Sequence, residues 1–240
     1  MHLPSLDFFV IGEGPVILFL HGWGQNKEMM MPLANELKRN YKCVFLDMPG
    51  FGNSEFNKES NLDEYCKNIH DFLLVKLHLR PEYIVGHSFG GKVAVHYYLK
   101  YRNVKKITLL ASPILKPKRT FKYYFNLYLY KVMKKLNLRN NLGSKDYKES
   151  GKMKSFFVSV VNTHYNKIIK KITIPVLLIY SKEDEKVDFS RANRLSKKLK
   201  KARLRVIKGD HFAYLNNKRI VSMEINEFFK ENENKREYYL

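Results

Sequence analysis

The chain has 240 residues, of which 45% are hydrophobic and 14% aromatic, and this composition argues against an intrinsically disordered protein. Lysine and arginine outnumber the acidic residues by 44 to 23, which gives a formal charge of +21. Such an excess is compatible with nucleic acid, an anionic membrane or an acidic protein as partner. For the body of the protein we interpret it as a solvated surface, and we expect no nucleic-acid partner.

The cysteines and the apolar runs bear on the compartment. Cys43 and Cys66 have the spacing of neither a metal site nor a disulfide framework, so we interpret them as buried free thiols in a reducing environment. The first residues lack the charged start and apolar core of a signal peptide. The longest apolar run, residues 15–20, is far shorter than the roughly 20 residues of a membrane span. We therefore expect a cytoplasmic protein with no transmembrane segment.

Strand-like and helical patterns alternate along most of the chain. Runs without polar alternation, such as Val16–Leu20, indicate strands that are buried on both faces, as in a parallel sheet. The predicted strands are residues 8–11, 16–20, 42–46, the run before Gly86, 106–111, 175–180 and 204–207. The predicted helices are residues 29–39, 62–77, 92–101, 190–200 and 217–230. This order predicts an α/β fold with a mostly parallel, doubly wound sheet and helices on both faces.

The alternation stops at residues 115–172, where no convincing strand is found. Helical patterns cover residues 121–136, 152–161 and 165–172, and the segment has 15 basic against 2 acidic residues, a net charge of +13. It is too short and too polar to form its own core. We predict a basic helical insertion (115–172) in one core domain made of residues 1–114 and 173–240.

A Gly-x-Ser-x-Gly motif, residues 86–90, follows a β-branched run and precedes a helical pattern. A serine at such a strand-to-helix turn is typical of a nucleophile elbow, where the turn strains the backbone and exposes the hydroxyl. The flanking glycines, which carry no Cβ, allow the strand and the helix to approach closely. The motif predicts Ser88 as a nucleophile.

A serine nucleophile needs a base to take its proton and a carboxylate to orient that base. His211 follows the predicted strand 204–207 and is the best base among the eight histidines. Asp184 follows the strand 175–180 and is the first choice for the acid, with Asp188 and Glu183 in reserve. We expect Asp210, the sequence neighbour of His211, to be structural.

The oxyanion of a tetrahedral intermediate needs two backbone N–H donors that are already in place. One donor is expected from Phe89, directly after the nucleophile. The second is expected from the loop His21-Gly22-Trp23-Gly24, at the end of a buried strand, where the amide of Trp23 is the natural candidate.

These motifs together resemble the α/β-hydrolase superfamily, in the branch of capped esterases that includes carboxylesterases and carrier-protein methyl esterases. The resemblance rests on residues 21–24, 47–54 and 86–91, on Asp184 and on residues 209–212, and it covers the chain apart from the insertion. Ser181 stands where the family usually has a glycine, which loosens the placement of Asp184. A serine at the elbow argues against the haloalkane dehalogenase and epoxide hydrolase branches.

The resemblance implies a serine hydrolase that cleaves a small-molecule carboxylic ester or thioester through a covalent acyl-Ser88 intermediate. Two alternatives stay open: hydrolysis of a C–C bond with the same three residues, and a hydrolase-fold binding protein without turnover. No metal cluster, phosphate-cradling loop or dinucleotide fingerprint is present in the sequence, so we expect no metal and no cofactor.

The insertion occupies the position of the family's variable cap. The candidate pocket residues are His21, Gly22, Phe121, Phe125, Tyr128 and Phe212. Aromatic and lysine residues interleave in this cap, which we interpret first as an ordinary amphipathic lid. The alternatives are an acidic carrier protein, as for the carrier-protein methyl esterase of biotin synthesis, or an anionic lipid surface.

Overall fold

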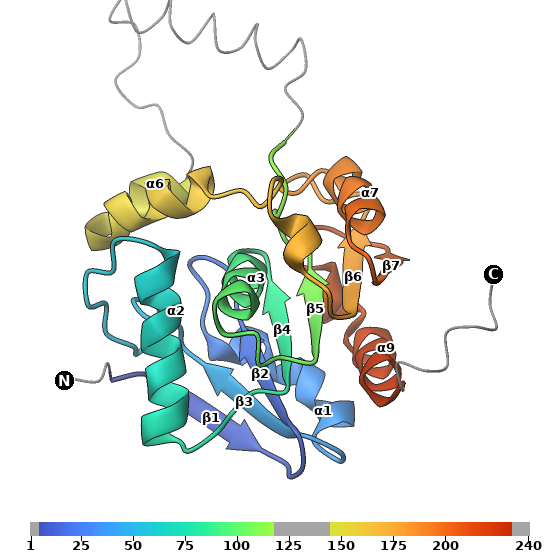
Figure 1. Cartoon of the computed structure of the whole chain (residues 1–240), viewed down its shortest axis with the longest axis horizontal. Helices are drawn as coiled ribbons and strands as arrows, with labels where there is room; N and C mark the ends of the chain where they lie inside the picture. Colours follow the sequence, from blue (N-terminus) through green and yellow to red (C-terminus); the bar gives the residue numbers. More distant parts are fainter. Residues whose placement is uncertain (1–4, 118–144, 232–240) are drawn as a thin grey trace, which may run out of the picture.

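The central element of the computed structural model, which describes residues 5–117 and 145–231, is a seven-stranded sheet (Figure 1). Its strands lie in the order β1-β3-β2-β4-β5-β6-β7. Strand β1 pairs with β3 in antiparallel orientation, and the other neighbours pair in parallel. The strands are β1 (Phe8–Ile11), β2 (Val16–Leu20), β3 (Lys42–Leu46), β4 (Tyr83–His87), β5 (Lys106–Leu110), β6 (Val176–Ser181) and β7 (Ala202–Ile207). The predicted mostly parallel α/β sheet is confirmed.

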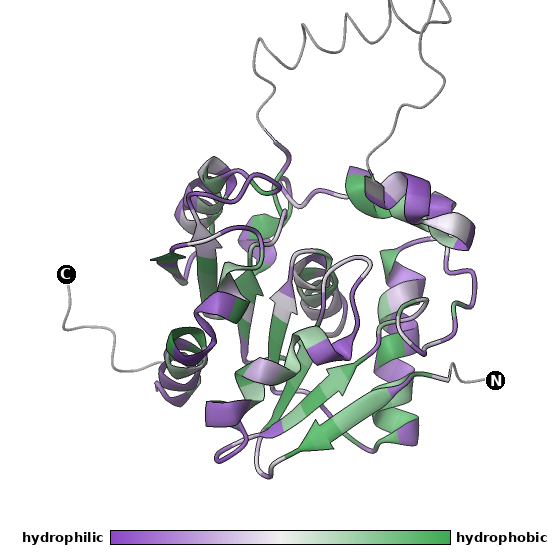
Figure 2. Ribbon diagram, turned by 180° about the vertical axis from the view of Figure 1, so that it is seen from behind, coloured by the Kyte–Doolittle hydropathy of each residue, from purple (hydrophilic) through white to green (hydrophobic). Residues whose placement is uncertain are grey.

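The middle strands are apolar throughout because both of their faces are covered. In β2, Leu18 and Leu20 belong to one hydrophobic cluster, and Ile17 and Phe19 belong to the cluster on the opposite face. Strands β2, β4, β5 and β6 are buried along their whole length. Figure 2 shows this sheet as a mainly hydrophobic layer, whereas the helices around it carry hydrophilic positions as well.

Helices cover the two faces of the sheet. Helices α2 and α3 contribute to the first cluster, and α1 and α9 contribute to the second. The core helices are α1 (Ala34–Leu37), α2 (Leu62–Asp71), α3 (Phe89–Tyr101), α7 (Phe189–Lys198), α8 (Ala213–Asn216) and α9 (Lys218–Lys230). The carboxyl ends of the parallel strands share one edge, where open α/β sheets place their sites.

Two of the helices expected in the core differ in the structure. In place of one helix over 29–39, the structure has 3-10 turns at Lys27–Met29 and Met31–Leu33 and then the short α1; Pro32, which has no amide hydrogen, lies in the first positions of the second turn. Beyond Asp71 the expected helix continues as a π-helical turn over Phe72–Lys76, which buries Phe72 and Leu73.

The described part of the insertion packs on the core. It contains α5 (Lys145–Glu149) and α6 (Lys154–Asn162), and Figure 1 shows α6 above α2. Phe156 of α6 stacks on Tyr65 of α2 with ring centroids 4.6 Å apart, and it belongs to the same hydrophobic cluster as the sheet. The helix expected over residues 165–172 is instead a 3-10 turn at Ile169–Lys171. Tyr165, Ile169 and Ile172 of this stretch are buried. The pattern at residues 121–136 lies outside the described residues.

The structure also bears on the two cysteines and on the membrane. Cys43 and Cys66 are buried free thiols. Burial raises the pKa of the Cys43 thiol to about 12. In residues 5–117 and 145–231, no helix has both the length and the apolar character that crossing a membrane requires.

Candidate active site

Ser88 lies at a tight turn between β4 and α3, as the elbow motif predicts. Its φ is +50° and its ψ is −109°, a combination that L-residues rarely adopt. A Cβ at Gly86 would lie 2.5 Å from the Gly90 carbonyl oxygen, and one at Gly90 would lie 2.2 Å from the Leu20 carbonyl oxygen. The two glycines are therefore required by the close approach of β2, β4 and α3, which holds the strained serine at the edge of a cavity that it lines.

His211 and Asp184 meet at the same edge of the sheet. His211 follows β7 and Asp184 follows β6, and the Nδ1–H of His211 donates to Oδ2 of Asp184 over 2.8 Å. The side chains are 8% and 0% exposed. Because Nδ1 carries this proton, Nε2 of a neutral His211 remains an acceptor. His211 and Ser88 line the same cavity.

Asp184 is fixed on both of its oxygens. Oδ1 accepts hydrogen bonds from the amides of Lys186, at 2.8 Å, and Val187, at 2.9 Å. Burial raises the pKa of this carboxyl, but the hydrogen bonds from His211 and from the two amides outweigh burial and hold the pKa below its ordinary value. Asp184 is therefore ionised at neutral pH and can stabilise a protonated His211.

The other acids near His211 bond to the backbone. Asp188 caps α7 by accepting from the Ser190 amide at 2.6 Å, and Glu183 accepts from the Gly209 amide. Asp210 accepts from the Phe212 amide at 2.8 Å, in agreement with its expected structural role. Among these carboxylates, Asp184 is the one that contacts the imidazole of His211.

Trp23 and Phe89, the two expected oxyanion donors, line the cavity beside Ser88. Phe89 is the first residue of α3, where amide hydrogens have no partner within the helix. Trp23 lies in a turn that the Gln25 side chain closes by accepting from the Gly22 amide at 2.8 Å. In the part of the chain that the structure describes, neither the Trp23 nor the Phe89 amide donates a hydrogen bond.

His21 does not line the cavity, which corrects the expectation that it contacts substrate. It is fully buried, its Nδ1 donates to the Gly22 carbonyl at 2.8 Å, and its Nε2 accepts from the Met48 amide at 3.0 Å. Burial lowers its pKa to about 4, so the imidazole is neutral. His21 joins the loop of Trp23 to the loop after β3, and its role is structural.

His87, directly before the nucleophile, has a positioning role that the sequence did not reveal. It is fully buried, and its Nε2 donates to the backbone carbonyl of His211 at 3.1 Å. Burial, and next the nearby His211, lowers the pKa of His87 to about 3. The strand that carries Ser88 therefore also holds the backbone of His211.

The cavity has a volume of about 580 Å³. Both apolar and polar side chains line it. Gly22 and Phe212, both expected, lie on its wall, whereas Phe121, Phe125 and Tyr128 lie outside the described residues. The apolar lining residues include Trp23, Phe89, Phe157, Val160, Val161, Val187 and Phe212. The polar lining residues beside Ser88 and His211 include Gln25, Lys92, Lys116, Asp146, Asn162, His164, Lys186 and Arg191.

The Trp23 indole joins the core to the cap at this cavity. Its ring centroid lies 4.8 Å from that of Phe157 on α6 and 5.3 Å from that of Phe89 on α3. In the described ranges, no group of three or more His, Cys, Asp or Glu side chains is placed to hold a metal ion.

Comparisons with known proteins agree with this fold. The family model of the alpha/beta hydrolase fold matches residues 15–141, just over half of the chain. The pimeloyl-[acyl-carrier protein] methyl ester esterase of Pseudoalteromonas atlantica is 33% identical over 111 residues, which are 45% of this chain and 41% of the relative. The AB hydrolase superfamily protein YisY of Bacillus subtilis is 24% identical over 225 residues, 81% of this chain and 83% of that protein. The chain thus matches about two fifths of the length of the Pseudoalteromonas atlantica esterase.

Solved structures share the fold over nearly the whole chain. An esterase from Exiguobacterium antarcticum superposes with a TM-score of 0.75 at 18% identity, covering 95% of this chain and 96% of the other. A meta-cleavage product hydrolase from Pseudomonas fluorescens superposes with a TM-score of 0.73 at 18% identity, covering 94% of each chain. Together with the family model, the order of the strands and the elbow at Ser88, these matches establish that the chain belongs to the alpha/beta hydrolase fold family.

Proposed function

We propose that the protein is a serine hydrolase that cleaves a carboxylic ester or thioester through a covalent acyl-Ser88 intermediate. The observation that carries this proposal is the buried hydrogen bond between His211 and Asp184, in a cavity that the strained Ser88 also lines. Membership of the hydrolase family supports the reaction class.

The proposed reaction begins when the Ser88 hydroxyl attacks the carbonyl carbon of the substrate and His211 Nε2 takes the hydroxyl proton. Asp184 stabilises the imidazolium, and the amides of Trp23 and Phe89 donate to the oxyanion. The loss of one such donor typically lowers the rate by about 10²–10³. His211 then gives its proton to the leaving alcohol or thiol, and a water activated by His211 releases the acyl group from Ser88.

The cavity supports a substrate with an apolar portion. Trp23, Phe157 and Phe212 offer aromatic surface beside Ser88. Relatives of the matched region carry the names pimeloyl-[acyl-carrier protein] methyl ester esterase and monoacylglycerol lipase, which favour an ester as the substrate. A small-molecule ester or thioester is the proposed substrate.

The partner of the cap and the location of the protein are also proposed. An acidic carrier protein or an anionic lipid surface is a candidate partner for the basic cap, whose 15 basic residues fall partly outside the described ranges. A cytoplasmic location is supported by the unpaired, buried state of Cys43 and Cys66.

Labelling with a fluorophosphonate probe tests the nucleophile. We expect the probe to label the wild type and not Ser88→Ala, because the probe bonds to an activated serine oxygen. Equal labelling of both proteins would contradict the proposal.

A substrate panel then tests the bond that is cleaved. We expect turnover of p-nitrophenyl esters or of acyl thioesters. Turnover of a β-diketone without turnover of either ester class would instead assign the C–C hydrolase reaction, and saturable ligand binding without any turnover would assign a binding protein.

A further inference from the structure

One part of the cavity wall carries an excess of positive charge. Its cationic side chains come from four separate segments: Lys92 from α3, Lys116 from the loop after β5, Lys186 from the loop after β6, and Arg191 from α7. Among the described lining residues, Asp146 is the carboxylate that opposes these four cations. Substrate that enters the cavity therefore meets a net positive wall.

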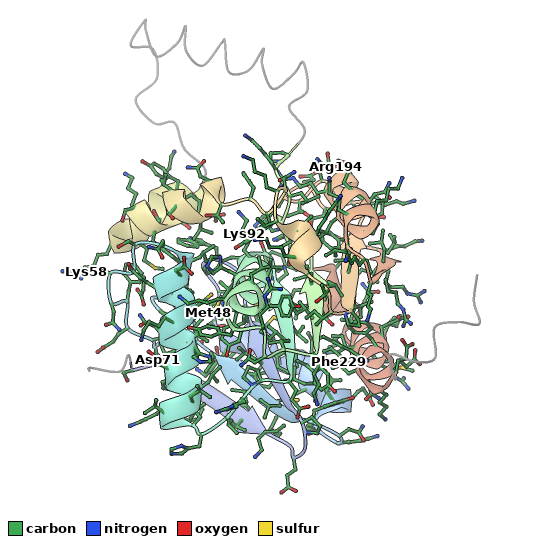
Figure 3. All side chains as sticks on the ribbon, in the orientation of Figure 1. Met48, Lys58, Asp71, Lys92, Arg194 and Phe229 are labelled. Atoms are coloured by element: carbon green, nitrogen blue, oxygen red, sulfur yellow. The ribbon has the colours of Figure 1, made fainter. Side chains whose placement is uncertain are left out.

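Lys92 is buried in this wall without an acidic partner. The residue is 4% exposed, and its Nζ donates to the carbonyl oxygen of Val160, near the end of α6, at 2.8 Å. Within the described ranges it forms no ion pair. In Figure 3, Lys92 lies between α3 and the segments of the insertion. Its ammonium thus keeps donor capacity beyond the one carbonyl, because it carries three hydrogens.

Arg191 and His164 each place a nitrogen in this region with no partner. Arg191 Nε and His164 Nδ1 are buried and form no hydrogen bond among the described residues. Both residues line the cavity. Buried polar atoms are nearly always paired in native proteins, with protein groups, water or ligands, so two unpaired nitrogens beside a buried ammonium leave donors and acceptors for a group outside the described residues.

The charges of this wall act on one another. Burial, then Arg191, lowers the pKa of Lys92 to about 8. Burial, then Lys92, Arg191 and Lys116, lowers the pKa of His164 to about 4. An anion placed among these groups would relieve both the burial cost and the mutual repulsion.

A purely structural role explains only part of this arrangement. The bond from Lys92 to Val160 joins α3 to the end of α6, where a cation is favourable. It leaves the unpaired nitrogens of Arg191 and His164 without an explanation, and both residues line the same cavity as Ser88.

We propose that Lys92, Arg191 and His164, the basic wall, form a subsite for an anionic oxygen group of the substrate, so that the enzyme prefers esters or thioesters that also carry a carboxylate or a phosphate-like group. The anion-binding part stands on the cavity alone, whereas the preference among esters rests on the proposed hydrolase function. Lys92 comes four residues after Ser88, about 6 Å along the helix axis. The anion is therefore expected a few bonds from the reacting carbonyl.

Matched small esters test the preference. The substrates are monomethyl succinate, methyl 3-phosphonopropionate and the neutral dimethyl succinate, measured as kcat/KM. We expect at least one anionic ester to exceed the neutral ester by tenfold or more, mainly through a lower KM. The carboxylate and the phosphonate distinguish the two kinds of anion, and a preference for either supports the subsite. Equal kcat/KM for all three esters overturns it.

Variants of the basic wall localise the effect. We expect Arg191→Gln and Lys92→Gln to reduce the ratio of anionic to neutral kcat/KM at least fivefold, and Arg191→Lys to retain most of it. Lys198→Gln, an exposed charge on the same helix that does not line the cavity, is the matched control and should leave the ratio unchanged. An unchanged ratio in Arg191→Gln and in Lys92→Gln would contradict the assignment.

A binding experiment separates this proposal from the hydrolase function. Calorimetry of Ser88→Ala with succinate and with 3-phosphonopropionate needs no turnover. Saturable binding that is lost in Ser88→Ala/Arg191→Gln supports the subsite even if no ester is hydrolysed. No binding of either anion, in a protein that melts as the wild type does, overturns it.

Discussion

The two polar walls of the cavity differ in how their hydrogen bonds are completed. At the first wall, Asp184 accepts from His211 and from two amides, so both of its oxygens are paired inside the protein. At the second wall, Arg191 and His164 keep buried nitrogens unpaired and Lys92 has a carbonyl as its partner. A paired network is rigid and orients a reactive group, whereas an unpaired buried polar group is costly until a bound group completes its hydrogen bonds. The comparison separates residues that position chemistry from residues that select the substrate.

The largest expected effect is the loss of the nucleophile at the paired wall. We expect Ser88→Ala to lower kcat for p-nitrophenyl acetate on the order of 10⁶-fold, because the remaining groups cannot form an acyl-enzyme. The circular dichroism spectrum and the melting temperature should stay close to those of the wild type. A variant that retains a hundredth of the activity would place the reaction elsewhere.

The next effect distinguishes Asp184 from its acidic neighbour. Asp184→Asn should lower kcat about 10⁴-fold, because an amide can no longer hold His211 in the Nδ1–H form or stabilise its charge. Asp188→Asn is the matched control, and since asparagine also caps helices we expect a change of no more than a few-fold. A severe loss in Asp188→Asn with a mild one in Asp184→Asn would reverse the assignment of the acid.

The third prediction concerns Phe156, which anchors α6 of the insertion to α2 of the core. The residue is fully buried and packs against Tyr65, so Phe156→Ala should lower the free energy of unfolding by about 3–5 kcal/mol, as measured by urea denaturation. Val158→Ala, on the exposed side of the same helix, should change it by less than about 0.5 kcal/mol. Equal effects of the two substitutions would show that α6 is not anchored through Phe156.

The smallest effect is a pH dependence of the basic wall. Lys92 has a pKa lowered to about 8, so it is protonated below that pH and loses its charge as the pH rises through it. The ratio of kcat/KM for monomethyl succinate to that for dimethyl succinate should therefore fall between pH 7 and pH 9, by up to about tenfold. His164, with a pKa of about 4, stays neutral across this range, and Arg191 stays charged.

The ratio cancels the pH effects that both esters share. In Lys92→Gln we expect the ratio to be low and flat over the same range. A wild-type ratio that rises with pH would contradict the assigned direction.

The sheet and the catalytic edge were predictable because their signals are local. Buried apolar runs mark the strands, and Ser88, Asp184 and His211 each come directly after a strand of a parallel sheet, which brings them to one edge. Asp188 accepts a hydrogen bond from the Ser190 amide, and Asp184 contacts His211. Both contacts depend on the folded structure, so the sequence left the choice of acid open.

The basic wall was not predictable in the same way. Lys92, His164 and Arg191 belong to no motif, and they converge only after α3, the insertion and α7 have packed together. The position of Lys92 four residues after Ser88, between apolar residues of the first turns of α3, is the one signal that could have indicated it. His21 misled for the opposite reason, because its motif is local but its side chain is turned into the core.

The order of the strands along the chain has a consequence for biosynthesis. The turn at Ser88 is held by β2, β4, α3 and β5, whose Leu110 carbonyl accepts from the Ser88 amide at 2.9 Å, but Asp184 and His211 follow β6 and β7. Because a ribosome releases the amino-terminal part first, the serine is assembled before its base and its acid exist. A nascent chain that has reached only β5 therefore lacks the proposed base and acid of Ser88, and we expect it to be without activity until β6 and β7 have joined the sheet.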